Sequence, residues 1–381
     1  MSQDSPEFFD STPGQAGEPP LVARVDMSQL VANMACLRQA APGLGMLAVV
    51  KADAYGHGAV AVARTLVAAG AEGLCVATMA EALELRQHGI QAPVLVLGDQ
   101  RPESVPVASA QGIDLAVVSH EHLRDLLPLV PQYPVGLHVR LDTGMGITGF
   151  QVQELDSAMD SLRSLRPWIR GIMGQFSDAE VPDGRSVAQQ RKAFQVGVAQ
   201  LREAGISPPM VHHANSAACL RGFTEGDTHV RCGIGLYGLL DIPEAASAGL
   251  QPILELVAEV IRAARVPTGT MVGYGGTWIA PHPVTLATLG CGYADGFFRA
   301  LSNHAWAGFK GTAYPLVGTV SMDVVMVVLP VDADVQAGDR MTLLSRHPED
   351  PNSVLNTARL LRTIPYEVTC ALHRRVIRHH F

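Results

Sequence analysis

The stretch AVVKADAYGHG, from Ala48 to Gly58, carries the strongest signal for both the fold and the chemistry of this chain. The apolar run Met46–Val50 predicts a buried parallel strand. Lys51 ends that strand, and a lysine is almost never fully buried without a partner. Glycines on both sides of His57 allow the backbone to turn tightly. The pattern predicts a strand that delivers one ammonium group to the edge of a sheet.

Two interpretations of Lys51 follow from its position alone. In the first, its amine bonds covalently to an aldehyde cofactor, which is a common role for a lysine held in a dry site. In the second, the side chain extends from the strand end and places its ammonium group in water. Tyr55, four residues further on, adds a hydroxyl group to the same segment.

Apolar runs alternate with amphipathic segments over roughly the next 200 residues, a length typical of a barrel. The runs are Met46–Val50, Leu74–Ala77, Val94–Leu97, Leu115–Val118, Gly136–Leu141, Ile169–Met173, Met210–His212 and Val230–Leu236. Helical spacing marks Ala59–Ala69, Ala80–His88, Glu121–Leu127 and Val187–Ala204. Eight strands with helical crossovers predict a (β/α)8 TIM-type barrel, and an open doubly wound sheet is the alternative.

The pattern changes after about residue 250. Short apolar or β-branched runs, separated by Gly and Pro turns, predict a second, mostly β domain. These runs are Ile253–Arg265, Val284–Leu289, Pro315–Val317, Val324–Leu329 and Arg340–Leu344. We therefore expect a barrel over residues 21–250 and a β-rich domain over 251–381. The early run Leu21–Val25 is a candidate to pair with the second domain, and residues 1–20, rich in Pro, Gly, Ser and acids, read as a disordered tail.

Composition excludes several classes of function. A formal net charge of −8 argues against a nucleic-acid partner, since phosphate binding needs clustered Lys and Arg. The sequence has no run of about 18 apolar residues, so it predicts no membrane-spanning helix. The six cysteines are scattered without a CxxC pair, which indicates reduced thiols in a cytoplasmic protein and no metal site. The start of the chain has neither the basic nor the apolar part of a secretory signal.

Two motifs near the predicted seventh and eighth strands suggest an anion site. They are HHANSAACL, His212 to Leu220, and RCGIGLYGL, Arg231 to Leu239. Barrels often bind phosphate after these strands, with backbone N–H groups pointing at the anion. Ser216 offers a hydroxyl group, although Asn215-Ser216 alone also fits an ordinary helix cap. Arg231 alone fits a structural salt bridge equally well.

Together these segments resemble the alanine racemase family, which depends on pyridoxal 5'-phosphate, over about residues 21–378. The resemblance implies a barrel that carries the cofactor on Lys51. It implies that Arg231 faces the pyridine nitrogen, to which a guanidinium donates a hydrogen bond without giving up its proton. The residues implied to hold the cofactor are Lys51, Tyr55, His212, Ser216, Arg231, Gly233, Ile234 and, from TIPYEVTC, Tyr366.

The resemblance also implies a second catalytic base. Racemisation removes a proton from one face of Cα and returns it to the other, which two groups on opposite faces achieve directly. Lys51 is one base, and Tyr274 in VGYGGTW is the candidate for the other. Taken alone, a tyrosine between glycines is more often a turn residue than a catalytic one. In the family Tyr274 and Met322, from VGTVSMD, act in the partner subunit's site, so a homodimer is expected.

Three positions depart from the family pattern. In HVRLDTGMGITGF the usual lysine, often carbamylated, is Arg140, and the usual arginine, which helps hold the substrate carboxylate, is Ile147. In GIMGQFSDAEVPD the usual histidine is Gln175, which keeps its hydrogen-bonding capacity but cannot carry charge. The residues expected to contact substrate are therefore Met322, Ile147 and Arg140.

The function expected from these motifs is interconversion of L- and D-alanine by a two-base mechanism. Ile147 favours an alternative, in which a specialised relative racemises another amino acid or catalyses retro-aldol or decarboxylation chemistry. A third reading is a non-catalytic cofactor-binding barrel protein. The complete second domain with Tyr274 and Met322 argues against that third reading.

Overall fold

The computed structural model describes residues 18–181 and 185–381. The chain forms two compact units, one made of residues 30–250 and the other of the N-terminal segment up to residue 29 together with residues 251–381. Residues 1–17, most of the expected tail, lie outside the described residues. Glu18, at its end, accepts hydrogen bonds from the Arg24 guanidinium at 2.9 and 2.8 Å.

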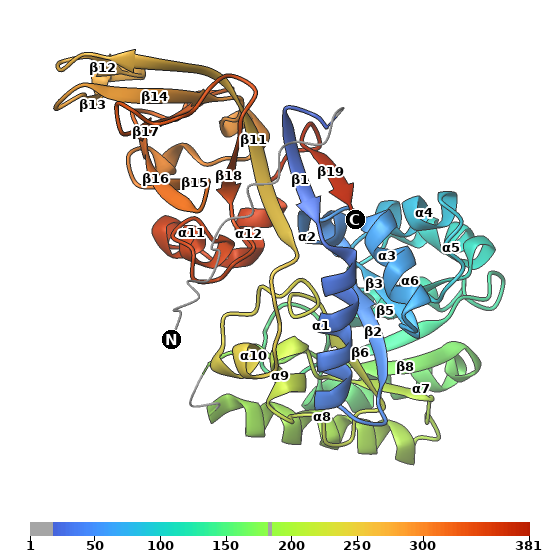
Figure 1. Ribbon diagram of the computed structural model, residues 1–381. Coiled ribbons are helices and arrows are strands. Elements are labelled where there is room, and N and C mark those ends of the chain that lie inside the picture. Colours follow the sequence, from blue (N-terminus) through green and yellow to red (C-terminus); the bar gives the residue numbers. More distant parts are fainter. Residues whose placement is uncertain (1–17, 182–184) are drawn as a thin grey trace. The chain divides into compact units, whose positions relative to one another are not determined.

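In the described residues of the first unit, eight parallel strands form the predicted barrel (Figure 1). They are β2 (Gly45–Val49), β3 (Gly73–Val76), β4 (Val94–Val96), β5 (Ile113–Val117), β6 (Leu137–Asp142), β8 (Ile169–Met173), β9 (Met210–His212) and β10 (His229–Cys232), in the order β10-β2-β3-β4-β5-β6-β8-β9. Most of their residues are buried, as expected for strands covered on both faces.

The ends of this sheet meet, which makes the unit a nearly closed barrel and rules out the open sheet. Thr228 N–H donates to Val211 O at 2.7 Å, and Arg231 N–H donates to Ala214 O at 2.9 Å. These two bonds join β9 to β10. The barrel prediction is confirmed, and the doubly wound alternative is wrong.

Helices surround the barrel strands (Figure 1). They are α1 (Met27–Ala40), α2 (Lys51–Gly56), α3 (Ala59–Ala68), α4 (Met79–Gln87), α5 (Val105–Gln111), α6 (His120–Leu126), α7 (Leu155–Ser164), α8 (Arg185–Glu203), α9 (Ser216–Leu220) and α10 (Pro243–Ser247). Side-chain caps fix where three of them begin: Thr78 for α4, Ser119 for α6 and Asn215 for α9. No described helix is both long and apolar enough to cross a bilayer.

The eighth strand is shorter than its apolar run predicts. The run extends to Leu236, but β10 ends at Cys232. Leu236 N–H donates back to Gly233 O at 2.8 Å, so the chain turns directly after the strand. The turn places backbone N–H groups at the strand end, and its two glycines let neighbouring side chains approach closely: a Cβ on Gly233 would stand 2.5 Å from the Tyr55 hydroxyl oxygen, and one on Gly235 would stand 3.0 Å from Ser216 Cβ.

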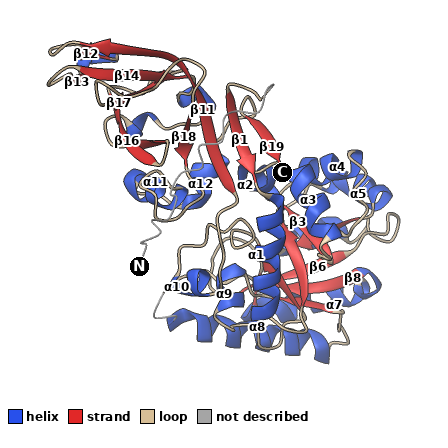
Figure 2. Cartoon of the chain, in the orientation of Figure 1, coloured by secondary structure: helices blue, strands red, loops and turns tan. Residues whose placement is uncertain are grey.

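The second unit is mostly strand (Figure 2). Its sheet contains β1 (Leu21–Val25), β11 (Leu254–Val266), β14 (Val284–Leu289), β15 (Trp306–Phe309), β16 (Thr312–Val317), β17 (Val325–Leu329), β18 (Arg340–Leu344) and β19 (Ile377–His380). β11 pairs antiparallel with both β14 and β18, which closes part of the sheet into a small barrel. β1 pairs antiparallel with β11 and parallel with β19. The unit ends with α11 (Val354–Leu361) and α12 (Pro365–Cys370) before β19.

Candidate active site

Lys51 follows β2 and begins α2, whose inner residues form a left-handed turn. Ala52, Asp53, Ala54 and Tyr55 all have φ of 53–54°, although none is glycine. A left-handed conformation costs an L-residue roughly 1–2 kcal/mol, so four in succession cost about 4–8 kcal/mol. Strain of this size persists only where the surroundings over-determine it, and such sites are often functional.

Backbone and side-chain hydrogen bonds hold this turn. Ala54 N–H donates to Val50 O at 2.9 Å, and Gly58 N–H donates to Asp53 O at 2.9 Å. The Asp53 carboxylate accepts from Ala59 N–H at 2.7 Å, where α3 begins. Glu81, on α4, accepts from Ala52 N–H at 2.7 Å. The turn is therefore tied to both neighbouring helices.

Tyr55 lies against the turn that follows β10. A Cβ placed on Gly233 would stand 2.5 Å from the Tyr55 hydroxyl oxygen, so only glycine fits there. The Tyr55 ring also packs on Tyr237, with centroids 5.0 Å apart, and the Tyr237 hydroxyl donates to Val49 O at 2.9 Å. The structure thus brings Tyr55, predicted from the first motif, to the glycines of the second.

Ser216 joins the same cluster. It is buried, and its Oγ accepts from Gly233 N–H at 3.0 Å and from Gly235 N–H at 3.2 Å. The hydroxyl oxygen thus accepts two backbone N–H groups, and its own proton can be donated either to the neighbouring Cys232 sulfur or to an anion. Asn215 is the residue that caps α9, through its bond from Ala218 N–H at 3.0 Å. The helix-cap interpretation therefore describes Asn215 and leaves Ser216 for another role.

Arg231 is buried and has four uncharged acceptors. One terminal nitrogen donates to His212 Nδ1 at 2.8 Å and to His212 O at 2.6 Å; the other donates to Gly174 O at 2.5 Å and to Gln175 Oε1 at 2.7 Å. A guanidinium has five N–H groups, so the Nε–H group is left over. Burial lowers the pKa of Arg231. The salt-bridge alternative is wrong in the described residues, because these four acceptors are neutral.

The hydrogen bonds of Arg231 determine the state of His212. Burial, reinforced by the charge of Arg231, holds the pKa of His212 well below its usual value. His212 is therefore neutral and accepts at Nδ1. Its Nε2 lies 2.8 Å from His138 Nδ1, and the Asp114 carboxylate lies 3.5 Å beyond His138 Nε2. A chain of polar groups thus runs from Arg231 down the barrel interior.

Arg140 and Ile147 flank a loop that Asp142 organises. The Asp142 carboxylate accepts hydrogen bonds from the N–H groups of residues 144, 145 and 146 and from the Gln151 amide, at 2.9–3.1 Å. Ile147 is 71% exposed. Arg140 lies in β6 and is half-buried, and burial lowers the pKa of its guanidinium. Within residues 18–181 and 185–381, Arg140 makes no side-chain hydrogen bond, although the charge of Asp142 favours its protonated form.

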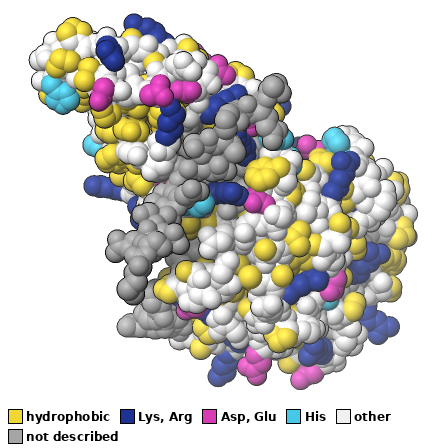
Figure 3. Space-filling model, in the orientation of Figure 1, with side chains coloured by type: hydrophobic (Ala, Val, Ile, Leu, Met, Phe, Trp, Pro, Cys, Tyr) yellow, Lys and Arg dark blue, Asp and Glu magenta, His cyan; other side chains and the backbone are white. Residues whose placement is uncertain are grey.

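The remaining predicted site residues belong to the second unit. Tyr274 lies between β12 (Met271–Val272) and β13 (Trp278–Ile279), 76% exposed, and its carbonyl accepts from the Thr319 hydroxyl at 2.9 Å. Met322 is 52% exposed, and Tyr366 lies in α12. Figure 3 shows hydrophobic side chains on the surface of this unit. A cavity of about 390 Å³ adjoins Tyr274 and is lined also by Gly273, Thr319, Ser321, Val324 and Met326.

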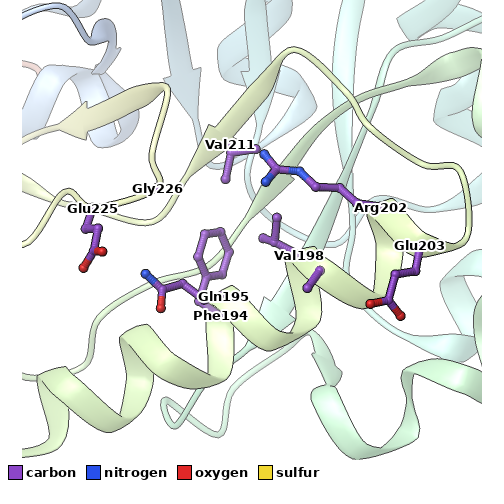
Figure 4. A pocket seen from close by; sticks show the side chains of 9 residues that line it. Phe194, Gln195, Val198, Arg202, Glu203, Val211, Glu225 and Gly226 are labelled. Atoms are coloured by element: carbon purple, nitrogen blue, oxygen red, sulfur yellow. The ribbon is translucent and has the colours of Figure 1, made fainter.

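A second cavity, of about 450 Å³, belongs to α8 and contains none of the predicted residues (Figure 4). Phe194, Val198 and Arg202 line it from the helix, and Glu225 from the loop before β10. In the described part of the chain no group of three His, Cys, Asp or Glu side chains could hold a metal ion.

Sequence reasoning missed Glu81 and Tyr237, which both support the segment around Lys51. Glu81 was detectable, because Thr78 and Glu81 form the T-x-x-E pattern of a capping box. Tyr237 carried no comparable signal, because a tyrosine after two glycines also fits a simple turn.

The fold and the site define a protein class: a (β/α)8 barrel with its polar residues at the carboxyl ends of the strands, continued by an antiparallel β domain. Family comparison refines this. Residues 25–241 match the model of the alanine racemase N-terminal domain, and residues 253–380 match that of the alanine racemase C-terminal domain.

Individual relatives agree with the domain matches. The chain is 34% identical over 362 residues to an alanine racemase of Nostoc sp., covering 93% of this chain and 94% of that protein. It is 36% identical over 368 residues to the alanine racemase of Geobacillus stearothermophilus, covering 93% of this chain and 92% of that protein. The Clostridium difficile 630 alanine racemase structure superposes with a TM-score of 0.89 at 30% identity, covering 96% of each chain. The Bacillus anthracis alanine racemase structure, with bound L-Ala-P, superposes with a TM-score of 0.87 at 32% identity, covering 96% of this chain and 95% of that one.

This chain belongs to the alanine racemase family, whose members depend on pyridoxal phosphate. The family expected from the sequence motifs is confirmed.

Proposed function

We propose that this protein is an isomerase that interconverts L- and D-alanine, with pyridoxal 5'-phosphate bound to Lys51. The observation that carries the proposal is the convergence of three motifs in one unit. Lys51 and Tyr55 follow β2, Ser216 follows β9, and Arg231 lies in β10, two residues before Gly233. When bound, the cofactor supplies an aldehyde that bonds to amines and a ring that withdraws electrons from Cα.

The residues at the end of β10 fit a phosphate group. Ser216 has a hydroxyl proton to donate, and Tyr55 presents its hydroxyl group against Gly233. Ile234 is buried, and its N–H group has no acceptor within the described residues. A buried donor without an acceptor is costly unless a ligand satisfies it. Tyr366 is proposed as a further phosphate contact.

Arg231 fits the nitrogen of the cofactor ring. Its four terminal N–H groups are occupied, and Nε–H has no acceptor within the described residues. Because a guanidinium keeps its proton, the ring nitrogen receives a hydrogen bond and no proton. By donating a hydrogen bond without a proton, Arg231 would limit the electron withdrawal that a bound cofactor supplies, which would favour return of a proton to Cα over transamination. His212 keeps Arg231 in place by accepting at Nδ1.

Two groups exchange the Cα proton in this proposal. The Lys51 amine, released when the substrate amine takes its place, serves one face, and the Tyr274 hydroxyl serves the other. Tyr274 and Met322 act in the site of a partner subunit, which makes the working form a homodimer. Their exposure in the single chain, 76% and 52%, supports this assignment. A cytoplasmic location, expected from the scattered cysteines, belongs to the same proposal.

Arg140 is proposed to hold the substrate carboxylate in place of the arginine that the family has at position 147. It lies in β6, two residues before the strand ends, and within residues 18–181 and 185–381 its guanidinium donates no side-chain hydrogen bond. Ile147, exposed and apolar, cannot pair with a carboxylate, which supports the second candidate function, racemisation of another amino acid. The carboxylate role predicts that Arg140→Met raises the KM for alanine roughly 10- to 100-fold, since a charge-assisted hydrogen bond contributes about 1.5–3 kcal/mol.

Labelling and product analysis test the proposal. The cofactor-loaded protein is reduced with borohydride and digested, and the label is mapped; a panel of L-amino acids is then assayed for D-products. We expect the label on Lys51 and D-alanine as the main product. Label on another lysine overturns the site, and a different main product supports the second candidate.

Mixing of variants tests the homodimer. Lys51→Ala and Tyr274→Phe proteins are each expected to be inactive, and mixed dimers should regain activity because one of their two sites contains both bases. Absence of activity after confirmed subunit exchange would place both bases in one chain.

A further inference from the structure

Glu81 joins the ends of two neighbouring barrel strands. Its Oε1 accepts from Ala52 N–H, directly after Lys51, at 2.7 Å. Its Oε2 accepts from Ala77 N–H at 2.7 Å and from Thr78 N–H at 3.0 Å, directly after β3. One carboxylate therefore binds three backbone N–H groups, and hydrogen bonds to a charged acceptor are the strong kind.

The carboxylate is itself held firmly in position. Glu81 N–H donates to the Thr78 hydroxyl at 3.3 Å, which completes a capping box at the start of α4. Capping accounts for the bonds on the β3 side but not for the bond to Ala52, which lies 29 residues earlier. That bond is made to the first residue of the left-handed turn. Glu81 is thus placed to stabilise the strained backbone.

We propose that Glu81 is a positioning residue for Lys51. By fixing the Ala52 N–H group, it holds the chain in the left-handed turn and thereby sets the direction in which the Lys51 side chain leaves the strand. The inference rests on the proposed attachment of the cofactor to Lys51. Without the carboxylate, residues 52–55 relax toward right-handed conformations, which are favoured for Ala and Asp.

Glu81→Gln is the informative substitution. A glutamine side chain has one acceptor oxygen, so it can serve Ala52 or the Ala77–Thr78 pair but not both. We expect amide hydrogen exchange to quicken in a peptide covering residues 51–58, and pyridoxal phosphate to bind at least about tenfold more weakly, from the loss of a charge-assisted bond. The pH profile of the absorbance of the bound cofactor should shift as well.

A control and a rescue distinguish positioning from general stabilisation. Glu84→Gln changes an exposed carboxylate on the same helix and should leave cofactor affinity and the pH profile unchanged. Ala52→Gly, at an exposed position with φ of 53°, removes the steric cost of the left-handed conformation without losing a buried contact. In the Glu81→Gln background it should recover cofactor affinity at least about fivefold, because relieving roughly 1–2 kcal/mol of strain corresponds to about 5- to 30-fold in affinity.

The outcomes separate cleanly. If Glu81→Gln only lowers the melting temperature and leaves cofactor affinity and the pH profile unchanged, Glu81 is a capping residue and the proposal is overturned. Failure of Ala52→Gly to recover affinity overturns it too. If the parent protein itself does not bind pyridoxal phosphate at Lys51, the proposed function has failed, whereas the exchange of residues 51–58 still reports whether Glu81 holds the turn.

Discussion

Replacing Arg231 by lysine should destabilise the barrel even though the charge is kept. The Arg231 side chain is 3% exposed and satisfies four buried acceptors through its two terminal nitrogens. An ammonium group has three N–H donors. At least one of the acceptors, His212 Nδ1, His212 O, Gly174 O or Gln175 Oε1, is therefore left without a partner in the interior.

The expected magnitude follows from that shortfall. A buried polar group left without a partner costs about 1–3 kcal/mol. For a unit of this size, 1 kcal/mol corresponds to roughly 2–4 °C in melting temperature, so Arg231→Lys should melt about 2–12 °C below the parent. Calorimetry on the cofactor-free proteins measures this without a contribution from ligand binding.

Arg170→Lys provides the matched control. Arg170 is another arginine of a barrel strand, but its side chain is 60% exposed and donates to Asp114 at 2.9 Å, a bond that lysine can also make. Because lysine keeps the bond to the buried Asp114 carboxylate and the Arg170 side chain is mostly exposed, this variant should melt close to the parent. If Arg231→Lys melts as high as Arg170→Lys, the four acceptors do not depend on the guanidinium and the reasoning is refuted.

Three shorter predictions concern neighbouring groups. Burial holds the pKa of His213 well below its usual value, so His213 stays neutral in the native protein, whereas in the unfolded chain it gains a proton below about pH 6.5. Lowering the pH from 7.5 to 5.5 should therefore reduce the free energy of unfolding by about 1.4 kcal/mol more in the parent than in His213→Phe, measured by urea unfolding at both pH values. Ser216→Ala removes the acceptor of Gly233 N–H and the proposed phosphate donor, and should weaken pyridoxal phosphate binding roughly tenfold in an absorbance titration, with Ser247→Ala on α10 as control. Tyr237→Phe leaves Val49 O without its buried donor and should lower the unfolding free energy by about 1–3 kcal/mol; an unchanged value would show that this bond contributes nothing.

Much of the barrel could be predicted because its strands are continuous apolar runs between amphipathic helices. The run Ile169–Met173, for example, is β8 to the residue, and Met210–His212 is β9. The end of β10 was misplaced because Ile234 and Leu236 extend the apolar run into a turn. Hydrophobicity reports burial, and residues in a buried turn are as apolar as those in a strand.

The conformation of the site was harder to predict. Four consecutive left-handed residues without glycine contradict local preference, and they form because contacts distant in sequence, such as that of Glu81, outweigh it. The four acceptors of Arg231 come from the ends of β8 and β9, so no local pattern contains them. The types of the motif residues were readable from the sequence, whereas their hydrogen-bond partners required the fold.

The seam between β9 and β10 gives Arg231 two duties. Its backbone N–H closes the barrel onto Ala214 O at 2.9 Å, while its side chain faces the interior. Ala214 N–H is in turn held by the Asp227 carboxylate at 2.9 Å. Any opening of the cylinder along this seam therefore displaces the guanidinium as well. Closure of the barrel and the position of the Arg231 guanidinium, proposed to face the cofactor ring, therefore depend on the same seam, and under that proposal a substitution at Asp227 would alter catalysis although Asp227 touches no reacting atom.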